Sequence, residues 1–192
     1  MTSPNDETKA QLRFEARRRR VAFVESLSVA ARQELEEALV AVLTPLIKQA
    51  RVVAGYHAHG SEIGLRYALR MAGNNRVEVV LPAFVTADSP MVFRSGAETE
   101  VGPHGIHQPP HQAKEVEPDL VLVPLLAVDG TGTRLGQGGG HYDRVLGALI
   151  AKGATVIGVG WPMQRIEFPL PRDSWDVALH GFASPHGLEL FA

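Results

Sequence analysis

The sequence contains no cysteine and few aromatic residues, which make up 6% of the chain. Without cysteine there can be no disulfide, thiolate nucleophile or cysteine-based zinc or redox site. The chain also lacks an apolar run of about 18 residues, the length that a membrane-spanning helix needs. Its polar start has no apolar core of a signal peptide. We therefore expect a cytoplasmic protein that does not associate with a membrane.

Strong net charge is absent too, because 19 basic and 21 acidic residues leave a formal charge of −2. A length of 192 residues with 45% apolar content predicts one globular domain, residues 1–192. Basic side chains nevertheless concentrate near the start. Lys9, Arg13, Arg17 and Arg20 follow one another at spacings of four, four and three, so they share one face of a helix. This pattern favours a local anion site over general binding of polyanions.

The chain reads as alternating helices and strands. A first helix is expected from Pro4 to about Leu27, and a second begins after Ser28, with Pro45 expected to kink or divide it. Strands are predicted over 51–58, 77–81, 91–94, 98–101, 120–124, 155–160 and 177–182, and helices over 62–72 and 142–151. Apolar strands alternating with helices predict an α/β domain of three layers, with a mainly parallel sheet covered by helices. The segment 101–118 is rich in Gly, Pro, His and Gln, and we interpret it as a long functional loop.

The most informative segment is rich in glycine and spans 123–144, between a predicted strand and a predicted helix. Glycines at 136, 138, 139 and 140 allow the backbone to approach a ligand closely, and a glycine loop before a helix offers N–H groups to phosphate oxygens. Arg134 and Arg144 flank it with guanidinium groups, and Asp143 is a candidate ligand for Mg²⁺.

Known phosphate-binding fingerprints do not fit this segment. A P-loop requires Lys-Ser/Thr after its last glycine, whereas His141-Tyr142 follows here. The dinucleotide pattern fails as well, because Leu135 or His141 stands where its third glycine is needed.

Arg134 to Asp143 reads Arg-Leu-Gly-x-Gly-x-Gly-x-Tyr-Asp, which resembles the signature of the 5-formyltetrahydrofolate cyclo-ligase family. Other family motifs are matched in order along nearly the whole chain. They are Lys9-x-x-x-Arg13, Tyr56 with Glu62, Leu81-Pro82 with Met91-x-Phe93, Gly105-Ile106-His107-Gln108-Pro109, and Gln164 with Pro171 and Asp176.

The resemblance implies an ATP- and Mg²⁺-dependent reaction. In this family, 5-formyltetrahydrofolate and MgATP give 5,10-methenyltetrahydrofolate, ADP and phosphate through a phosphorylated formyl intermediate. The family's fold is similar to that of sugar-phosphate isomerases and coenzyme A transferases. Small-molecule substrates are therefore the expected partners, without nucleic acid, and we expect a monomer or weak homodimer.

The resemblance also implies roles for individual residues. Catalysis is assigned to Arg134 and Lys9, and Mg²⁺ binding to Asp143 and Asp176. ATP binding is assigned to Lys9, Arg13, Arg134, Leu135, Gly136, Gln137, Gly138, Gly139, Gly140, His141 and Tyr142. Folate binding is assigned to Tyr56, Glu62, Met91, Phe93, His104 and Tyr142. A carboxylate at Glu62 would accept paired hydrogen bonds from the aminopyrimidinone edge of the pterin.

The chain departs from the family pattern at a few positions. His141 stands where a tyrosine is common, and Trp175 replaces a frequent histidine. Gly64 and Leu65 replace a polar pair that usually follows the glutamate. These changes affect the expected folate contacts and leave the phosphate-binding residues in place.

Three alternatives remain at this stage. His104, His107 and His111 have a spacing that would suit a metal site on a helix, but Pro103, Pro109 and Pro110 argue against a helix there. The arginines at 17–20 would suit an RNA-binding arm, although no aromatic platform accompanies them. A regulatory protein that binds folate and nucleotide without turnover is the third.

Overall fold

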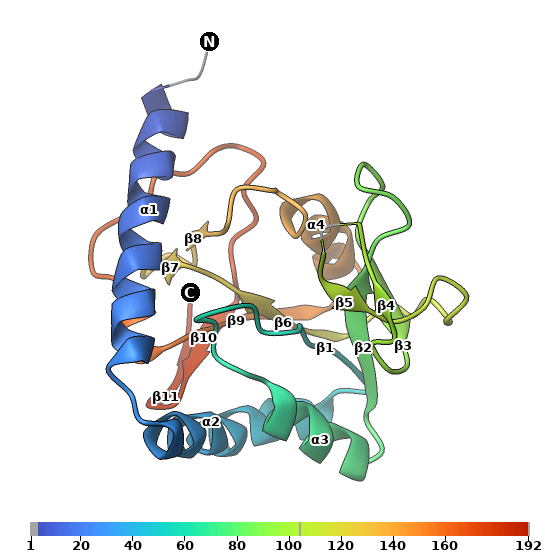
Figure 1. Cartoon of the computed structure of the whole chain (residues 1–192). Helices are drawn as coiled ribbons and strands as arrows, with labels where there is room; N and C mark the ends of the chain where they lie inside the picture. Colours follow the sequence, from blue (N-terminus) through green and yellow to red (C-terminus); the bar gives the residue numbers. More distant parts are fainter. Residues whose placement is uncertain (1–3, 104, 192) are drawn as a thin grey trace.

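The computed structural model describes residues 4–103 and 105–191. A seven-stranded sheet crosses its centre in the order β11–β10–β9–β6–β1–β2–β3 (Figure 1). The strands are β1 (Val52–Ala54), β2 (Glu78–Ala83), β3 (Val92–Ser95), β6 (Leu120–Pro124), β9 (Thr155–Val159), β10 (Gly181–Ser184) and β11 (Gly187–Leu190). The five inner strands are parallel, and the edge strands β3 and β11 are antiparallel to their neighbours.

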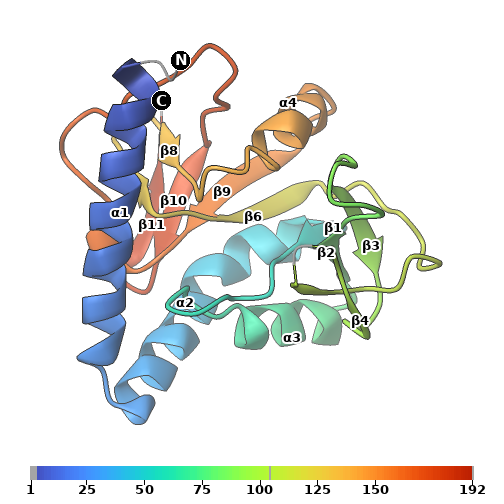
Figure 2. The same cartoon turned by 45° about the horizontal axis from the view of Figure 1, so that its top comes forward.

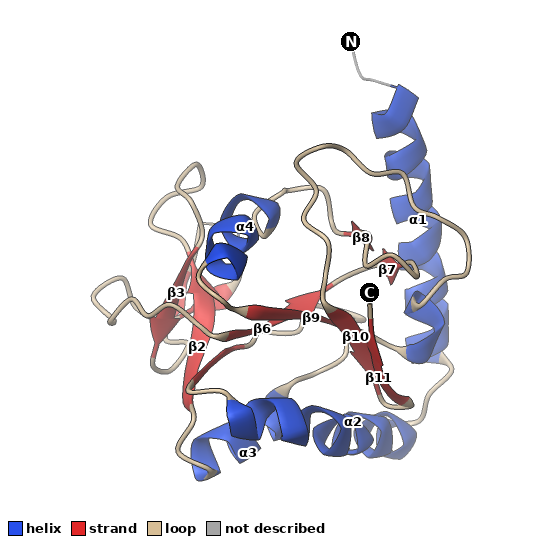
Figure 3. Cartoon of the chain, turned by 180° about the vertical axis from the view of Figure 1, so that it is seen from behind, coloured by secondary structure: helices blue, strands red, loops and turns tan. Residues whose placement is uncertain are grey.

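Helices cover both faces of the sheet, so the predicted three-layer α/β architecture is confirmed (Figure 3). On one face lie α2 (Val29–Gln49) and α3 (Arg66–Asn74), and on the other lies α4 (Asp143–Ala151). A hydrophobic core fills each interlayer space. Leu39 and Leu43 of α2 pack with Leu122 on the first side, and Leu146 of α4 packs with Val123 on the second.

Helix α1 (Pro4–Glu25) stands across the edge of these layers, beside a small hairpin of β7 (Ala127–Val128) and β8 (Arg134–Leu135) (Figure 2). Leu12 and Ala16 of the helix pack against Leu126 and Leu135, which form a third, smaller core. The predicted first helix is confirmed within two residues at its end. This apolar contact fixes the helix in place, and the adjacent basic face lines the cavity described below.

Pro45 does not divide α2, which runs unbroken through it. Proline removes one hydrogen bond from a helix interior, but Leu39, Leu43 and Ile47 are fully buried on the inner face and hold the helix on the sheet. The N-terminal cap at Ser28 is as predicted, because its side chain accepts a hydrogen bond from the backbone of α2. Within residues 4–103 and 105–191, no helix combines the length and the apolar character needed to cross a membrane.

The loop after β1 differs from the prediction, because the strand has only three residues. The Tyr56 hydroxyl donates to the Ile63 carbonyl at 2.9 Å, and the Glu62 carboxylate accepts from the His59 amide at 3.0 Å. These bonds fold the loop back on itself, and the next helix therefore begins at Arg66. Glu62 lies in the loop before α3 and not in the first turn of a helix.

Pro82 does not end β2, contrary to the prediction. It pairs with Phe93 of β3, and the Phe93 carbonyl accepts its hydrogen bond from Val116 on the other side. The missing N–H of proline therefore breaks no bond between the two strands, which is the setting in which a strand tolerates proline.

The remaining differences are short elements. The segment 101–118 is not a pure loop, because β4 (Glu100–Val101) pairs with β5 (His107–Gln108). The hairpin of β7 and β8, the edge strand β11 and a 3₁₀ helix, η1 (Pro162–Gln164), were not predicted. The last parallel strand begins at Gly181, later than the expected 177, because the backbone before it forms the loop that reaches α1.

Candidate active site

A cavity of about 950 Å³ opens at the carboxyl ends of the parallel strands. The chain order of the strands reverses between β1 and β6, since β1 leads outward to β2 while β6 leads the other way to β9. In open α/β sheets, ligands bind at such a switch point. Tyr56 after β1 and Pro124 at the end of β6 line the cavity on either side of this point.

The basic face of α1 forms one wall of the cavity, as the spacing predicted: Lys9, Arg13, Arg17 and Arg20 all line it. Arg13 donates from Nε to the Gly136 carbonyl at 3.1 Å, and Arg17 donates from Nη2 to the Gln137 side chain at 2.7 Å. The helix is thus attached directly to the glycine-rich loop.

The loop itself has the conformation that its composition predicts. Gly138 and Gly140 have φ angles of 105° and 62°, in the region that favours glycine. A Cβ at Gly139 would lie 2.8 Å from the His141 ring, so a side chain there would require that ring to move. All these residues line the cavity, together with Leu135 and Tyr142. The loop leads into α4, and the backbone amides of Arg144, Val145 and Leu146 in its first turn donate to the carbonyls of Gly140 and Tyr142.

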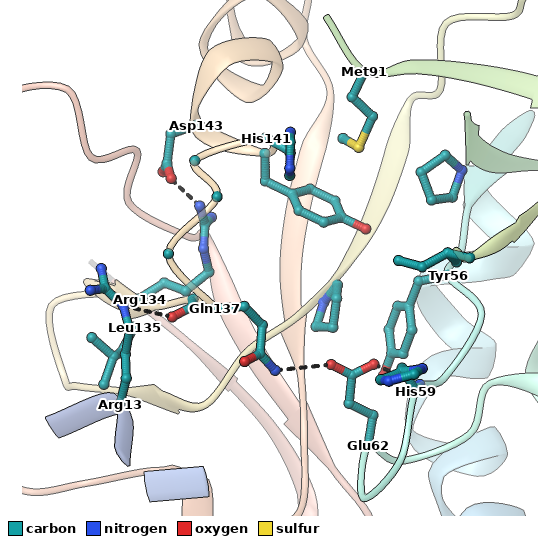
Figure 4. Close-up of a pocket in the computed structure, with 18 of the residues that line it drawn as sticks. Arg13, Tyr56, His59, Glu62, Met91, Arg134, Leu135, Gln137, His141 and Asp143 are labelled. Carbon is teal, nitrogen blue, oxygen red and sulfur yellow. Dashed lines mark hydrogen bonds and ion pairs between the residues drawn. The ribbon is translucent and has the colours of Figure 1, made fainter. Parts of the chain in front are cut away.

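An ion pair joins the two ends of this loop, Arg134 before it and Asp143 after it (Figure 4). Arg134 Nη2 lies 2.6 Å from Asp143 Oδ1, and the arginine side chain is only 5% exposed. Arg134 Nη1 is buried and has no hydrogen-bond partner. A buried guanidinium N–H without an acceptor costs about 1–3 kcal/mol, so this atom is suited to an oxygen that a ligand brings.

Lys9 is buried between two carboxylates. Its Nζ lies 2.7 Å from Asp173 Oδ2 and 2.5 Å from Asp176 Oδ2. Burial by itself would lower the pKa of the Lys9 ammonium group, but the hydrogen bonds and charges of both carboxylates outweigh it and raise that pKa. Lys9 is therefore a fixed cation that joins α1 to the loop before β10.

The two aspartates assigned to metal binding lie on the same side of the cavity. Each already forms an ion pair with a basic side chain, Asp143 with Arg134 and Asp176 with Lys9. The Val177 amide, next to Asp176, donates to Asp143 Oδ1 at 3.2 Å. Within the described part of the chain, the contacts of Asp143 use Oδ1 and those of Asp176 use Oδ2, so each carboxylate keeps a second oxygen. No group of three or more His, Cys, Asp or Glu side chains suited to a metal occurs among the described residues.

Glu62 lies at the other end of the cavity (Figure 4). Its Oε1 is 3.6 Å from Arg20 Nη1 and accepts a long, 3.5 Å hydrogen bond from the Gln137 amide. Tyr56 and Tyr142 stand near this carboxylate. Burial, followed by the negative charge of Glu62, raises the pKa of both hydroxyls, which therefore remain protonated at neutral pH.

Most residues assigned from the sequence are brought together here, with two exceptions. Met91 lines the cavity beside His141 (Figure 4), whereas Phe93 does not line it: its side chain, 5% exposed, packs in the core between the sheet and α4. His104 lies outside the described residues. His141 forms an edge-to-face contact with Phe84 at 4.9 Å between ring centroids.

Sequence reasoning missed several residues that line the cavity, among them His59, Phe84, Glu98 and Asp173. Asp173 had a usable signal in the sequence, because it precedes Asp176 by only three residues. The structure shows that both carboxylates bind Lys9. His59 and Phe84 carried none, since their place depends on the loops that follow β1 and β2.

Comparisons with known proteins place the whole chain in a family. Residues 5–184 match the model of the 5-formyltetrahydrofolate cyclo-ligase family. A curated 5-formyltetrahydrofolate cyclo-ligase of Haemophilus influenzae is 29% identical over 91% of this chain and 96% of its own. One from Mycolicibacterium smegmatis is 32% identical over 83% and 87%.

Solved structures show the same fold. The 5,10-methenyltetrahydrofolate synthetase of Aquifex aeolicus superposes with a TM-score of 0.76 and 28% identity, covering 95% of this chain and 92% of that one. That of Mycoplasma pneumoniae gives a TM-score of 0.71 over 92% and 98%, at 24% identity. The resemblance stated from the motifs is confirmed: the chain belongs to the 5-formyltetrahydrofolate cyclo-ligase family.

Proposed function

We propose that the protein converts 5-formyltetrahydrofolate and MgATP to 5,10-methenyltetrahydrofolate, ADP and phosphate. Family membership supports the activity, and one structural observation supports the roles that we assign to individual residues. A single cavity holds a carboxylate with aromatic walls at one end and a glycine loop with guanidinium groups at the other. Such a cavity suits a reaction that joins a pterin to a nucleotide's terminal phosphate.

The glycine-loop end would hold the triphosphate. Backbone N–H groups at 136–140 would bind phosphate oxygens, and Arg13 and Lys9 would add positive charge from α1. Arg134 supplies the buried Nη1 that lacks an acceptor. In phosphoryl transfer the protein mainly positions the substrates and stabilises charge, so we assign the largest catalytic role to Arg134.

Mg²⁺ fits the carboxylates at this end. It is usually bound by one or two carboxylates together with phosphate oxygens and water, so the lack of a larger acidic cluster agrees with a metal that arrives with ATP. Asp143 and Asp176 would hold it through Asp143 Oδ2 and Asp176 Oδ1, the carboxylate oxygens that the ion pairs with Arg134 and Lys9 do not use. When bound, it would neutralise phosphate charge. Arg134 and Lys9 fix the orientation of the two carboxylates.

The Glu62 end would hold the pterin. An ionised carboxylate accepts two parallel hydrogen bonds from an aminopyrimidinone edge, and Glu62 is held in place by the His59 amide and Arg20. Met91, Tyr56 and Tyr142 would form the apolar walls. Gln137 spans the distance between this carboxylate and the glycine loop, so the formyl group and the γ-phosphate would meet beside it.

In the proposed reaction the formyl oxygen attacks the γ-phosphorus, the bond from that phosphorus to the bridging oxygen breaks, and ADP leaves. The N10 lone pair then attacks the activated formyl carbon. The carbon–oxygen bond breaks and phosphate departs, while the N10 proton passes to phosphate or water. Each step is favoured by holding the partners in contact, which can contribute several kcal/mol to the barrier reduction.

The test is to mix the protein with 5-formyltetrahydrofolate and MgATP and to follow the near-ultraviolet absorbance of the methenyl product. We expect product only when ATP and Mg²⁺ are both present. Arg13→Ala should lower the rate, whereas Arg18→Ala, an exposed arginine on the same helix that does not line the cavity, should leave it unchanged. Binding of both ligands without product would instead support a regulatory protein and refute the proposal.

A further inference from the structure

Trp175 is an unusual side chain on the rim of the cavity. It is 69% exposed yet lines the cavity, whereas Trp161, the other tryptophan of the chain, is fully buried. Covering a large, exposed indole with a flat, apolar partner is energetically favourable. The residues around Trp175 determine which part of a bound ligand the indole can contact.

The turn that carries Trp175 is fixed in place. Asp173 and Asp176, on either side of it, both bind the ammonium group of Lys9. The Asp173 amide also donates to Asp176 Oδ2 at 2.8 Å, which closes the turn on itself. The indole is therefore presented from a rigid support at the edge of the cavity and not from a loose loop.

This support lies at the phosphate end. The Val177 amide, two residues after Trp175, donates to Asp143, which in turn binds Arg134. Glu62 and the ring of Tyr56 lie at the other end, beyond Gln137 (Figure 4). A group that extends from phosphates bound at Arg134, away from the pterin, would meet the indole.

We propose that Trp175 is the stacking platform for the adenine base of ATP. The proposal rests on the proposed function, because it takes the triphosphate to be bound at the glycine loop. Bases stack on aromatic side chains by their π-faces, largely independently of base identity. Trp175 thus contributes affinity for the nucleotide's base, while Arg134 and the loop amides contribute affinity for its phosphates.

The experiment compares two ligands on the wild-type chain and three variants by calorimetry without folate. MgATP carries the base, and magnesium tripolyphosphate lacks it. We expect Trp175→Ala to weaken MgATP binding about five- to tenfold and to leave tripolyphosphate binding within twofold. Trp175→Phe should restore most of the MgATP affinity. Phe168→Ala, which removes another exposed aromatic ring that does not line the cavity, should bind both ligands as the wild type does.

Tryptophan fluorescence gives a second readout. MgATP should change the emission of Trp175 and protect it from acrylamide, whereas tripolyphosphate should not. Unchanged MgATP affinity in Trp175→Ala, or an equal loss for both ligands, would refute the stacking role and leave the proposed function standing. If the wild-type chain bound neither ligand, the phosphate site and the proposed function would fail together with it.

Discussion

Replacing Arg134 by alanine tests the phosphate end most sharply. The guanidinium group is 5% exposed, holds Asp143 at 2.6 Å, and keeps a second buried nitrogen without an acceptor. Loss of one such preorganised donor typically lowers turnover 10²–10³-fold, or about 2.7–4 kcal/mol of transition-state stabilisation. We expect a kcat loss of this size for Arg134→Ala.

The same change also affects stability, and the two effects must be separated. Removing one partner of a buried ion pair costs about 3–5 kcal/mol, but the Asp143 side chain is 20% exposed and water can solvate it in part. We therefore expect the free energy of unfolding to fall by about 2 kcal/mol, less than for a fully buried pair. Arg134→Lys keeps the charge and loses the planar fork, so its kcat should lie between those of alanine and wild type.

The assay is steady-state production of the methenyl compound at saturating substrates, with denaturant unfolding measured on the same preparations. A large kcat loss at temperatures where Arg134→Ala is folded supports the assignment. A folded alanine variant whose kcat stays within threefold of wild type would refute it, because the buried donor would then have no role in the reaction.

Three further changes test other parts of the site. Asp143→Asn keeps an oxygen for Arg134 but loses the charge, so the Mg²⁺ concentration for half-maximal rate should rise several-fold; unchanged metal dependence would remove Asp143 from the metal site. Glu62→Gln should raise the KM for folate about tenfold or more and hardly change that for ATP, whereas equal changes in both would contradict a pterin-specific role. Lys9 has a raised pKa, so its contribution to stability is complete below the ordinary lysine pKa of about 10.4 and is lost as pH rises through the folded-state value. Lys9→Met should therefore be less stable than wild type at pH 8, with the difference shrinking above pH 10.4; a constant difference would show that the charge does not stabilise the fold.

The sequence predicted those features that depend on local pattern. The helical spacing of Lys9, Arg13, Arg17 and Arg20 placed them on one face, and the structure turns that face to the cavity. The apolar strand over 120–124 was predicted with its correct bounds because it is buried on both sides of a parallel sheet. The glycine loop was recognisable from its composition, because its backbone adopts φ angles at Gly138 and Gly140 that favour glycine.

Other features depend on contacts between distant residues. Lys9 and Asp176 are separated by 167 positions and meet only because α1 packs against the β7–β8 hairpin. The late start of α3 follows from hydrogen bonds within the loop that holds Glu62, which no periodicity reveals. Phe93 was assigned to the folate site by its motif, but it packs in the core behind the cavity wall.

The central claim is that the amides of 136–140 and the guanidinium of Arg134 bind the triphosphate beside the folate. A crystal structure with Mg²⁺, a non-hydrolysable ATP analogue and 5-formyltetrahydrofolate tests it directly. We predict phosphate oxygens on the loop amides and on Arg134 Nη1, with the pterin against Glu62. A triphosphate bound elsewhere, with that loop and Arg134 making no contact to it, would contradict the claim.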